Sequence, residues 1–224
     1  MHNVRIREHI VKRVMARRGK FHWFEELESN KTALLIIDMQ NTFCAPDSPA
    51  EVAGSREIVG PINLFTSDLR KKKIPVIWVL HANNQINGGS DWELFFNYVV
   101  SNDVKQRTIE SLAPGKQTIW KDLEHIDGDI TVMKNRYSAL IPGSSSLEPL
   151  LESLGIDTLL IAGTKTNICC ESTARDAMML GYKVVMVEDC CAALSDDEHL
   201  GALESIIQQF GDVMTSSEVL EILN

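Results

Sequence analysis

Cys169 is the residue of this 224-residue chain with the clearest capacity for chemistry. It follows an apolar run at 159–162, typical of a buried strand, and a break at Gly163. The sequence then predicts a helix with Thr166 or Asn167 as its N-cap and Cys169 in its first turn. Unpaired N–H groups and the helix dipole favour a thiolate there, and the same N–H groups could hold an oxyanion. A buried, unreactive cysteine is the common alternative, so the rest of the chain must decide.

Three other reactive side chains come at the ends of apolar runs. Predicted strands at 33–38, 75–81 and 129–134 end in Asp38, His81 and Lys134. Taken singly, the aspartate could cap a helix, the histidine could be an ordinary hydrogen-bonded one, and the lysine could be solvated. Parallel strands, however, deliver their carboxyl ends to one edge of the sheet, where ligands bind. We therefore predict that these groups meet Cys169 at one edge.

The elements that must position these groups alternate between strand and helix. Further strands are predicted at 158–162, 183–189 and 213–214, and helices at 56–73, 144–154, 169–181, 196–210 and the C-terminus. The apolar runs do not alternate with polar residues, which is typical of parallel strands covered on both faces. The pattern predicts a three-layer α/β/α fold with a doubly wound, six-stranded, mostly parallel sheet.

Two segments lie outside this alternation. Residues 1–20 carry seven Lys or Arg residues and one Glu, and apolar residues recur there at helical spacing. We expect a basic helix and connecting segment over 1–30, docked on the body or on another subunit, ahead of one domain at 31–224. An organelle transit peptide is the alternative. The polar excursion from Asn83 to Gly115 is expected to be a lid or binding loop, in which Trp92 walls a pocket or fills core.

Composition excludes several classes of function. The net charge of −9, without a basic patch, argues against a nucleic-acid partner, and no apolar run approaches the roughly 20 residues of a membrane span. Five cysteines, four of them in adjacent pairs, suit neither disulfides nor zinc, so we expect a cytoplasmic protein. Dinucleotide and P-loop glycine spacings are missing. Packing is the expected role of the remaining cysteines, Cys44, Cys170, Cys190 and Cys191.

Three motifs together resemble the isochorismatase-like cysteine hydrolase superfamily, from about Lys31 to the C-terminus. The first is Ile-Ile-Asp-Met-Gln-Asn-Thr-Phe at 36–43, and the second is Lys-Asn-Arg-Tyr-Ser at 134–138. The third is Gly-Thr-Lys-Thr-Asn-Ile-Cys at 163–169. They occur in order and on matching strand ends. The resemblance implies the Rossmann-like fold of that superfamily and a hydrolytic activity.

The resemblance implies a catalytic triad of Asp38, Lys134 and Cys169. It also implies a cis peptide bond between Thr164 and Lys165, which would turn the N–H of Lys165 toward the substrate. That N–H and the N–H of Cys169 would form an oxyanion hole. In such a site Asp38 takes the thiol proton, the thiolate attacks a carbonyl carbon, and water hydrolyses the thioester.

The resemblance also bears on metal and substrate. Nicotinamidase-like members carry an Asp-x-His metal cluster after the first strand, but residues 44–54 contain no histidine, so we expect no metal and no cofactor. Members that hydrolyse isochorismate lack the cysteine, which argues against that reaction. The motifs are most similar to those of ureidoacrylate amidohydrolases and N-carbamoyl amidases, so the expected substrate is a small linear amide or ureido compound. The residues expected to bind it are Gln40, Phe43, His81, Trp92, Tyr137 and Thr164. His81 departs from that subgroup, which tends to carry an amide side chain there.

Two alternatives remain at this point. One is an amide hydrolase in which Cys169 and His81 form a dyad and Lys134 is structural. The other is a binding or scaffold protein that keeps the fold without turnover. In each case the resemblance implies a homo-oligomer, a dimer or a tetramer.

Overall fold

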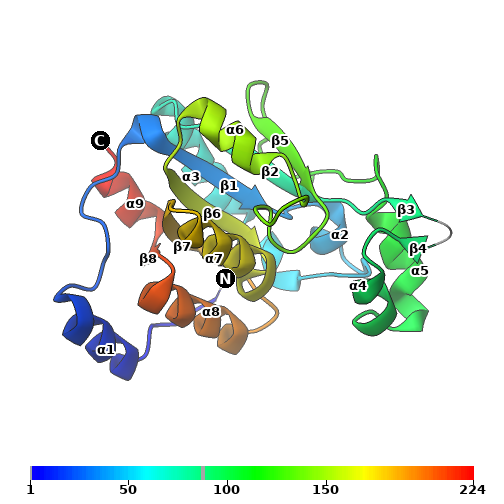
Figure 1. Ribbon diagram of the computed structural model, residues 1–224, viewed down its shortest axis with the longest axis horizontal. Coiled ribbons are helices and arrows are strands. Elements are labelled where there is room, and N and C mark those ends of the chain that lie inside the picture. The colour runs from blue at the N-terminus through cyan, green and yellow to red at the C-terminus, as the bar shows by residue number, and fades with distance from the viewer. Residues whose placement is uncertain (1, 87–88) are drawn as a thin grey trace.

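A six-stranded parallel sheet forms the centre of the computed structural model, which describes residues 2–86 and 89–224 (Figure 1). The strands are β1 (Thr32–Ile37), β2 (Val76–His81), β5 (Ile130–Lys134), β6 (Thr158–Thr164), β7 (Lys183–Ala192) and β8 (Asp212–Met214). Their order is β5-β2-β1-β6-β7-β8, and every neighbouring pair is parallel. The chain order reverses between β1 and β6, and such switch points form ligand crevices at the carboxyl ends of strands. The predicted doubly wound α/β fold is confirmed.

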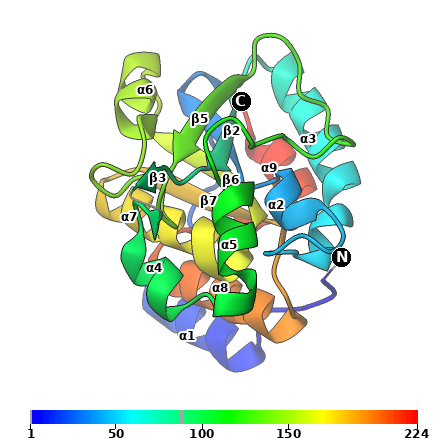
Figure 2. The same cartoon turned by 90° about the vertical axis from the view of Figure 1, so that its right-hand side faces the viewer.

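Helices cover both faces of the sheet, which explains the continuous apolar runs (Figure 2). Leu34 and Ile36 of β1 pack in a cluster with α3 (Val59–Lys71) and α9 (Ser216–Ile222). Leu35 and its neighbours at 33 and 37 belong to the cluster of the other face. That face carries α1 (Glu8–Arg18), α6 (Leu147–Leu154), α7 (Glu171–Met179) and α8 (Asp196–Gln209). Alternate residues of each central strand are thus buried on opposite sides.

The excursion between β2 and β5 is folded rather than extended. It holds the hairpin of β3 (Gln85–Ile86) and β4 (Gly89–Ser90), then α4 (Glu93–Tyr98) and α5 (Asn102–Ser111). Figure 2 shows α4 and α5 at the edge of the sheet where the strands end. The remaining short elements are η1 (Ser29–Lys31), α2 (Asn41–Cys44), η2 (Ala53–Arg56) and the π-helical turn η3 (Thr166–Cys170). Among the described residues, no helix is both long and apolar enough to cross a bilayer.

The basic N-terminal helix packs on the body of its own chain. Ile10 and Val14 of α1 are buried in the same core cluster as α7 and α8. Ahead of the helix, Arg7 donates from Nε to both carboxylate oxygens of Glu204 in α8, at 2.8 and 2.9 Å. The backbone N–H of Arg7 also donates to Glu204, at 2.9 Å. The segment before residue 31 therefore extends the helical layer over α8.

Gly163, the first residue of the motif that ends in Cys169, allows β6 to approach β1 closely. Its φ is +112°, and a Cβ atom there would lie 2.1 Å from the carbonyl oxygen of Ile37. The pairing of β6 with β7 shifts register at this point and resumes at Gly163 with Cys191. Because pairing resumes, β7 runs on to Ala192 instead of ending near 189 as the sequence predicted. The close contact between Gly163 and Ile37 also fixes the position at which the chain leaves β6 and turns toward Cys169.

Candidate active site

Four reactive side chains meet at the carboxyl edge of the sheet. His81 and Lys134 are paired as the last residues of the adjacent strands β2 and β5. Asp38 follows β1, and Cys169 lies in η3 after β6. One ligand-type atom from each of Asp38, His81 and Cys169 lies within 4.8 Å of the other two. The switch point of the sheet thus brings together residues that are up to 131 positions apart.

The ammonium group of Lys134 is buried and fully hydrogen-bonded. It donates to Asp38 Oδ2 at 2.9 Å, to His81 Nδ1 at 3.1 Å and to the carbonyl oxygen of Arg136 at 3.1 Å. Neither member of the Lys134–Asp38 ion pair has side-chain surface exposed to solvent. Burial is the largest single effect and would lower the pKa of Lys134, but Asp38 and Cys169 act together against it and the pKa is raised. The lysine is therefore a fixed positive charge beneath the site.

Asp38 is held in an uncommon conformation with one oxygen unpaired. Its φ is +55°, in the left-handed region that few non-glycine residues adopt. Its backbone N–H donates to the carbonyl oxygen of Val79 at 2.8 Å, which ties this conformation to β2. Carboxylate oxygen Oδ1 is buried and has no hydrogen-bond partner in the described part of the chain. A buried acceptor without a donor is costly, and the thiol of Cys169, which lies within 4.8 Å of an Asp38 carboxylate oxygen, is a donor of the kind it lacks.

The protonation of Cys169 differs from the sequence-based expectation. Burial, followed by the negative charge of Asp38, raises the pKa of the Cys169 thiol well above its usual value. Burial also raises the pKa of Asp38, against the opposing effect of Lys134. The resting pair is thus a neutral thiol beside a carboxylate of increased basicity. The sequence predicted that a helix N-terminus would favour a thiolate at Cys169. In the structure, burial and the neighbouring anion favour the neutral thiol instead, so this prediction is wrong for the resting state.

The helix start also differs from the predicted one. The chain makes the π-helical turn η3 first, and the regular helix α7 begins only at Glu171. Lys165 stands at the N-cap position of η3 without a side-chain cap bond. Thr166, one of the two predicted caps, instead pairs its hydroxyl with His199 Nδ1 at 2.8 Å. The extra residue of the π turn changes the direction in which Cys169 points, and π turns are frequent at functional sites.

His81 is neutral, and both of its ring nitrogens are engaged. Lysine only donates, so Nδ1 accepts from Lys134 and Nε2 carries the proton toward Asn83 Oδ1, at 2.8 Å. Burial, and then the charge of Lys134, lowers the pKa of His81 well below its usual value. A neutral imidazole whose lone pair is occupied by an ammonium group is a poor acceptor for a thiol proton. This geometry disfavours a dyad of Cys169 with His81.

The acid, imidazole and thiol are also metal-ligand types, so the site was compared with a metal centre. Lys134 Nζ already lies 2.9 Å from Asp38 Oδ2 and 3.1 Å from His81 Nδ1. A divalent cation would have to displace this ammonium group from two ligands, and the two positive charges would repel each other. The donor set therefore does not fit a metal while Lys134 is charged. That the site works without a metal stays a prediction.

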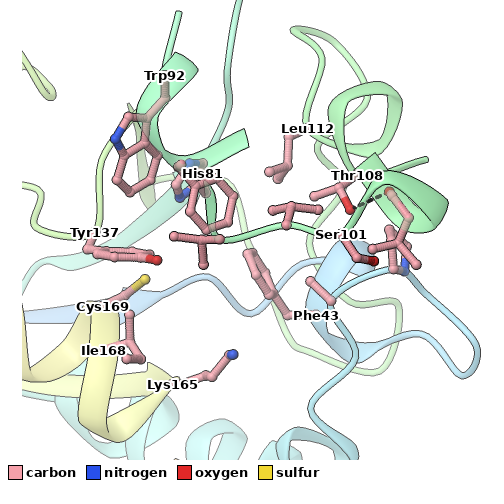
Figure 3. A pocket seen from close by; sticks show the side chains of 16 residues that line it. Phe43, His81, Trp92, Ser101, Thr108, Leu112, Tyr137, Lys165, Ile168 and Cys169 are labelled. Atoms are coloured by element: carbon pink, nitrogen blue, oxygen red, sulfur yellow. Dashed lines mark hydrogen bonds between the residues drawn. The ribbon is translucent and has the colours of Figure 1, made fainter. Parts of the chain in front are cut away.

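A cavity of about 520 Å³ opens above Cys169. Figure 3 shows the thiol pointing toward Tyr137, with His81 and Trp92 beyond it. The Trp92 ring stacks on His81 at 5.9 Å and meets Tyr137 edge-on at 4.7 Å. The guanidinium group of Arg136 lies over the indole ring, 5.2 Å from its centroid. Of the two interpretations considered for Trp92, the structure therefore favours a wall of the pocket.

Two residues expected to bind substrate do not line this cavity. Gln40 is fully buried, and its amide makes two hydrogen bonds with the backbone of His81, at 2.7 and 3.0 Å. Thr164 is also fully buried, and its hydroxyl donates to the carbonyl oxygen of Ala192 at 3.1 Å. Both side chains join neighbouring strand ends and thereby position the site. The other four residues expected to bind substrate, Phe43, His81, Trp92 and Tyr137, do line the cavity, together with Lys165 and Cys169, whereas Asp38 and Lys134 are buried and are not part of its lining.

Several site residues were not singled out from the sequence. Asn83 holds His81 and donates to Asp91 Oδ1 at 2.7 Å, and nothing in its sequence context marks this role. Val104, Thr108 and Leu112 line the far end of the cavity from one side of α5. Their spacing of four residues is a signal that could have identified this face.

The cis peptide bond that the family resemblance implied between Thr164 and Lys165 is present, just before η3.

Comparisons with known proteins agree with this fold. The model of the family described as Isochorismatase domain matches residues 32–218. The chain is 31% identical over 169 residues to a probable inactive nicotinamidase of Arabidopsis thaliana, covering 75% of this chain and 84% of the relative. It is 30% identical over 202 residues to YwoC of Bacillus subtilis (strain 168), an uncharacterized isochorismatase family protein, covering 87% and 95%. A cysteine hydrolase structure from Pseudomonas syringae pv. phaseolicola 1448A superposes with a TM-score of 0.77 at 27% identity, covering 90% and 96%.

Proposed function

Since the chain belongs to the isochorismatase family, we propose that it is a metal-independent cysteine amidohydrolase with Cys169 as nucleophile. It cleaves the C–N bond of a small linear amide, ureido or carbamoyl compound, such as a ureidoacrylate-like molecule. One observation carries the proposal. Asp38 keeps one oxygen on Lys134 and leaves the other buried and unpaired beside the only thiol that lines the cavity among the described residues.

The first half-reaction makes a thioester. Asp38 takes the proton of the Cys169 thiol, and the thiolate sulfur forms a bond to the substrate carbonyl carbon. The carbonyl electron pair moves to oxygen, which the N–H groups of Lys165 and Cys169 stabilise at about 3 kcal/mol for each donor. Asp38 then returns the proton to the leaving nitrogen as the C–N bond breaks. Lys134 keeps Asp38 anionic before the first of these transfers and again after the second.

The second half-reaction releases the acid. Asp38 takes a proton from a water molecule whose oxygen attacks the thioester carbon. The C–S bond breaks, and the sulfur recovers the proton that Asp38 holds. The products are the carboxylic or carbamic acid and ammonia or an amine, so the enzyme ends in its starting state.

Ammonia release tests this proposal against a panel of ureidoacrylate, N-carbamoyl amino acids, biuret, nicotinamide and aliphatic amides. We expect turnover of at least one compound, unchanged by EDTA. We also expect loss of turnover when one equivalent of iodoacetamide is incorporated, with the label on Cys169 by peptide mass. Turnover that survives full labelling of Cys169 would overturn the nucleophile. Activity that EDTA abolishes and zinc restores would overturn the metal-independent mechanism, and binding without turnover would favour the scaffold alternative.

A further inference from the structure

The reactive and charged groups of the cavity above Cys169 are gathered at one end. The thiol, the hydroxyl of Tyr137 and the ammonium group of Lys165 are at that end, and neither of the latter two has a hydrogen-bond partner among residues 2–86 and 89–224. Figure 3 shows Lys165 on the side of Ile168, away from Thr108 and Leu112. The polar groups are therefore available where an amide would react.

The other end of the cavity is mainly apolar and carries no charged side chain. Its apolar walls come from α2, the loop after it and the helical excursion, and consist of Phe43, Pro49, Ala50, Phe95, Val99, Val100, Val104 and Leu112. Two hydroxyl groups also lie there, that of Ser101 and that of Thr108, which already donates to the carbonyl oxygen of Val104 at 2.9 Å. A carboxylate at this end would lose its hydration and meet no cationic side chain, which is unfavourable. A volume of 520 Å³ also exceeds the needs of urea or formamide, since about 300–1,000 Å³ holds drug-sized ligands.

Resting on the proposed function, we propose that the substrate carries an uncharged apolar group, of about hexyl or phenyl size, beside its scissile amide or ureido group. The amide lies against Cys169 and Tyr137, and the apolar group lies between Phe43, Phe95 and the Val104 side of α5. The Trp92 ring forms a flat wall in the middle of the cavity, between the reactive end and the apolar end, and this wall suits a planar amide or aryl group.

A homologous series of primary amides tests this substrate class. From acetamide to hexanamide we expect kcat/KM to rise about fourfold for each methylene, the effect of burying one CH₂ group. Phenylacetamide should lie near the top of the series, and adipamate, which has a carboxylate at the end of its chain, near the bottom. Val104→Arg should reverse the order of hexanamide and adipamate. Gln106→Arg, on the exposed side of the same helix, is the matched control and should leave the order unchanged.

Binding separates failure of this inference from failure of the proposed function. Calorimetry with Cys169→Ala should show hexanamide binding more tightly than adipamate, whether or not the wild type turns either over. Cys169-dependent turnover that is flat along the series, or that favours adipamate and loses this preference in Lys165→Met, would overturn the apolar class. Equal binding of both compounds would overturn it as well. No turnover with the expected order of binding would overturn only the amidohydrolase function.

A second set of contacts joins the N-terminal segment to η3, the π-helical turn that carries Cys169. His2 Nδ1 lies 2.7 Å from Asp196 Oδ1, and His2 Nε2 accepts from the N–H of Ala193 at 3.0 Å. The His2 ring stacks on His199 with centroids 4.3 Å apart. His199 is 2% exposed, and its Nδ1 pairs with the buried hydroxyl of Thr166. Thr166 follows Lys165, whose N–H is one of the two proposed oxyanion donors.

We infer that His2 is a positioning residue, which holds η3 through His199 and Thr166. His2 lies outside residues 32–218, which match the family domain. The Arg7–Glu204 pair anchors the same segment on α8 independently. The loss of His2 should therefore loosen η3 without detaching the N-terminal helix.

The His2→Ala variant tests this role, with His9→Ala on the exposed side of α1 as its matched control. We expect kcat to fall about tenfold with KM within about twofold, since small displacements of catalytic groups reduce rate more than binding. The rate of iodoacetamide labelling of Cys169 should change in parallel, which needs no substrate. His2→Gln, whose amide can reproduce both hydrogen bonds, should recover most of the loss. Identical kcat and labelling rates in His2→Ala and His9→Ala would overturn the inference, as would a loss that His2→Gln does not recover.

Discussion

Replacing Cys169 by alanine should abolish amide turnover, with kcat lower by about 10⁴–10⁶-fold, as when a covalent nucleophile is removed. The sulfur is the only nucleophile that the mechanism uses, and the neighbouring groups cannot replace it. His81 has both nitrogens engaged, and Lys134 uses all three of its N–H bonds. Steady-state ammonia release measures the loss. Mass spectrometry of the wild type quenched during turnover should show an acyl adduct on Cys169.

Cys170→Ala is the matched control for this variant. Cys170 is the next residue and equally buried, but its sulfur points to the carbonyl oxygen of Ala162 and does not line the cavity. We expect it to keep kcat within about threefold, because it touches no reacting group. If Cys170→Ala lost turnover and Cys169→Ala kept it, Cys170 rather than Cys169 would be the nucleophile.

Replacing Lys134 by methionine should reduce both activity and stability. Without the ammonium group, the Asp38 carboxylate is left buried and unpaired, and breaking a buried ion pair typically costs about 3–5 kcal/mol of unfolding free energy. Asp38 would escape this cost by binding a proton, and a protonated acid cannot accept the thiol proton. We therefore expect kcat to fall by about 10²–10⁴-fold, the usual contribution of a general base. Urea unfolding and ammonia release measure the two effects.

The double variant Asp38→Asn, Lys134→Met separates stability from catalysis. It removes both buried charges, so unfolding free energy should return to within about 1–2 kcal/mol of the wild type, while turnover stays lost. Lys134→Met with near-native turnover would contradict the triad and would support the Cys169–His81 dyad. A double variant as unstable as Lys134→Met would show that packing of the lysine stem, rather than its charge, stabilises this edge.

The strands and most of the reactive edge were determined by the sequence itself. Continuous apolar runs specify strands buried on both faces, and parallel strands bring their carboxyl ends to one edge whatever their order. Asp38, His81 and Lys134 could therefore be placed together from strand ends alone. The family motifs added Tyr137 and Lys165, and the structure locates both at the same cavity as Cys169.

Side-chain direction and protonation were decided only by the tertiary structure. Gln40 and Thr164 lie within the motifs but turn away from the cavity, because neighbouring strand ends offer backbone partners for their polar atoms. The π turn, which local helix signals do not specify, sets the direction of Cys169. Burial beside Asp38 then makes the resting thiol neutral. These outcomes depend on desolvation and on partners far along the chain.

The same holds for the groups that surround the reacting atoms. Val104 and Thr108 lie on a helix whose local pattern predicts only a half-buried face, and the position of α5 at the edge of the sheet where the strands end makes that face a wall of the site. His2 and His199 are 197 positions apart, and only the docking of the N-terminal segment on α8 stacks their rings. Local spacing determines which residues share a face, whereas long-range packing determines what that face meets.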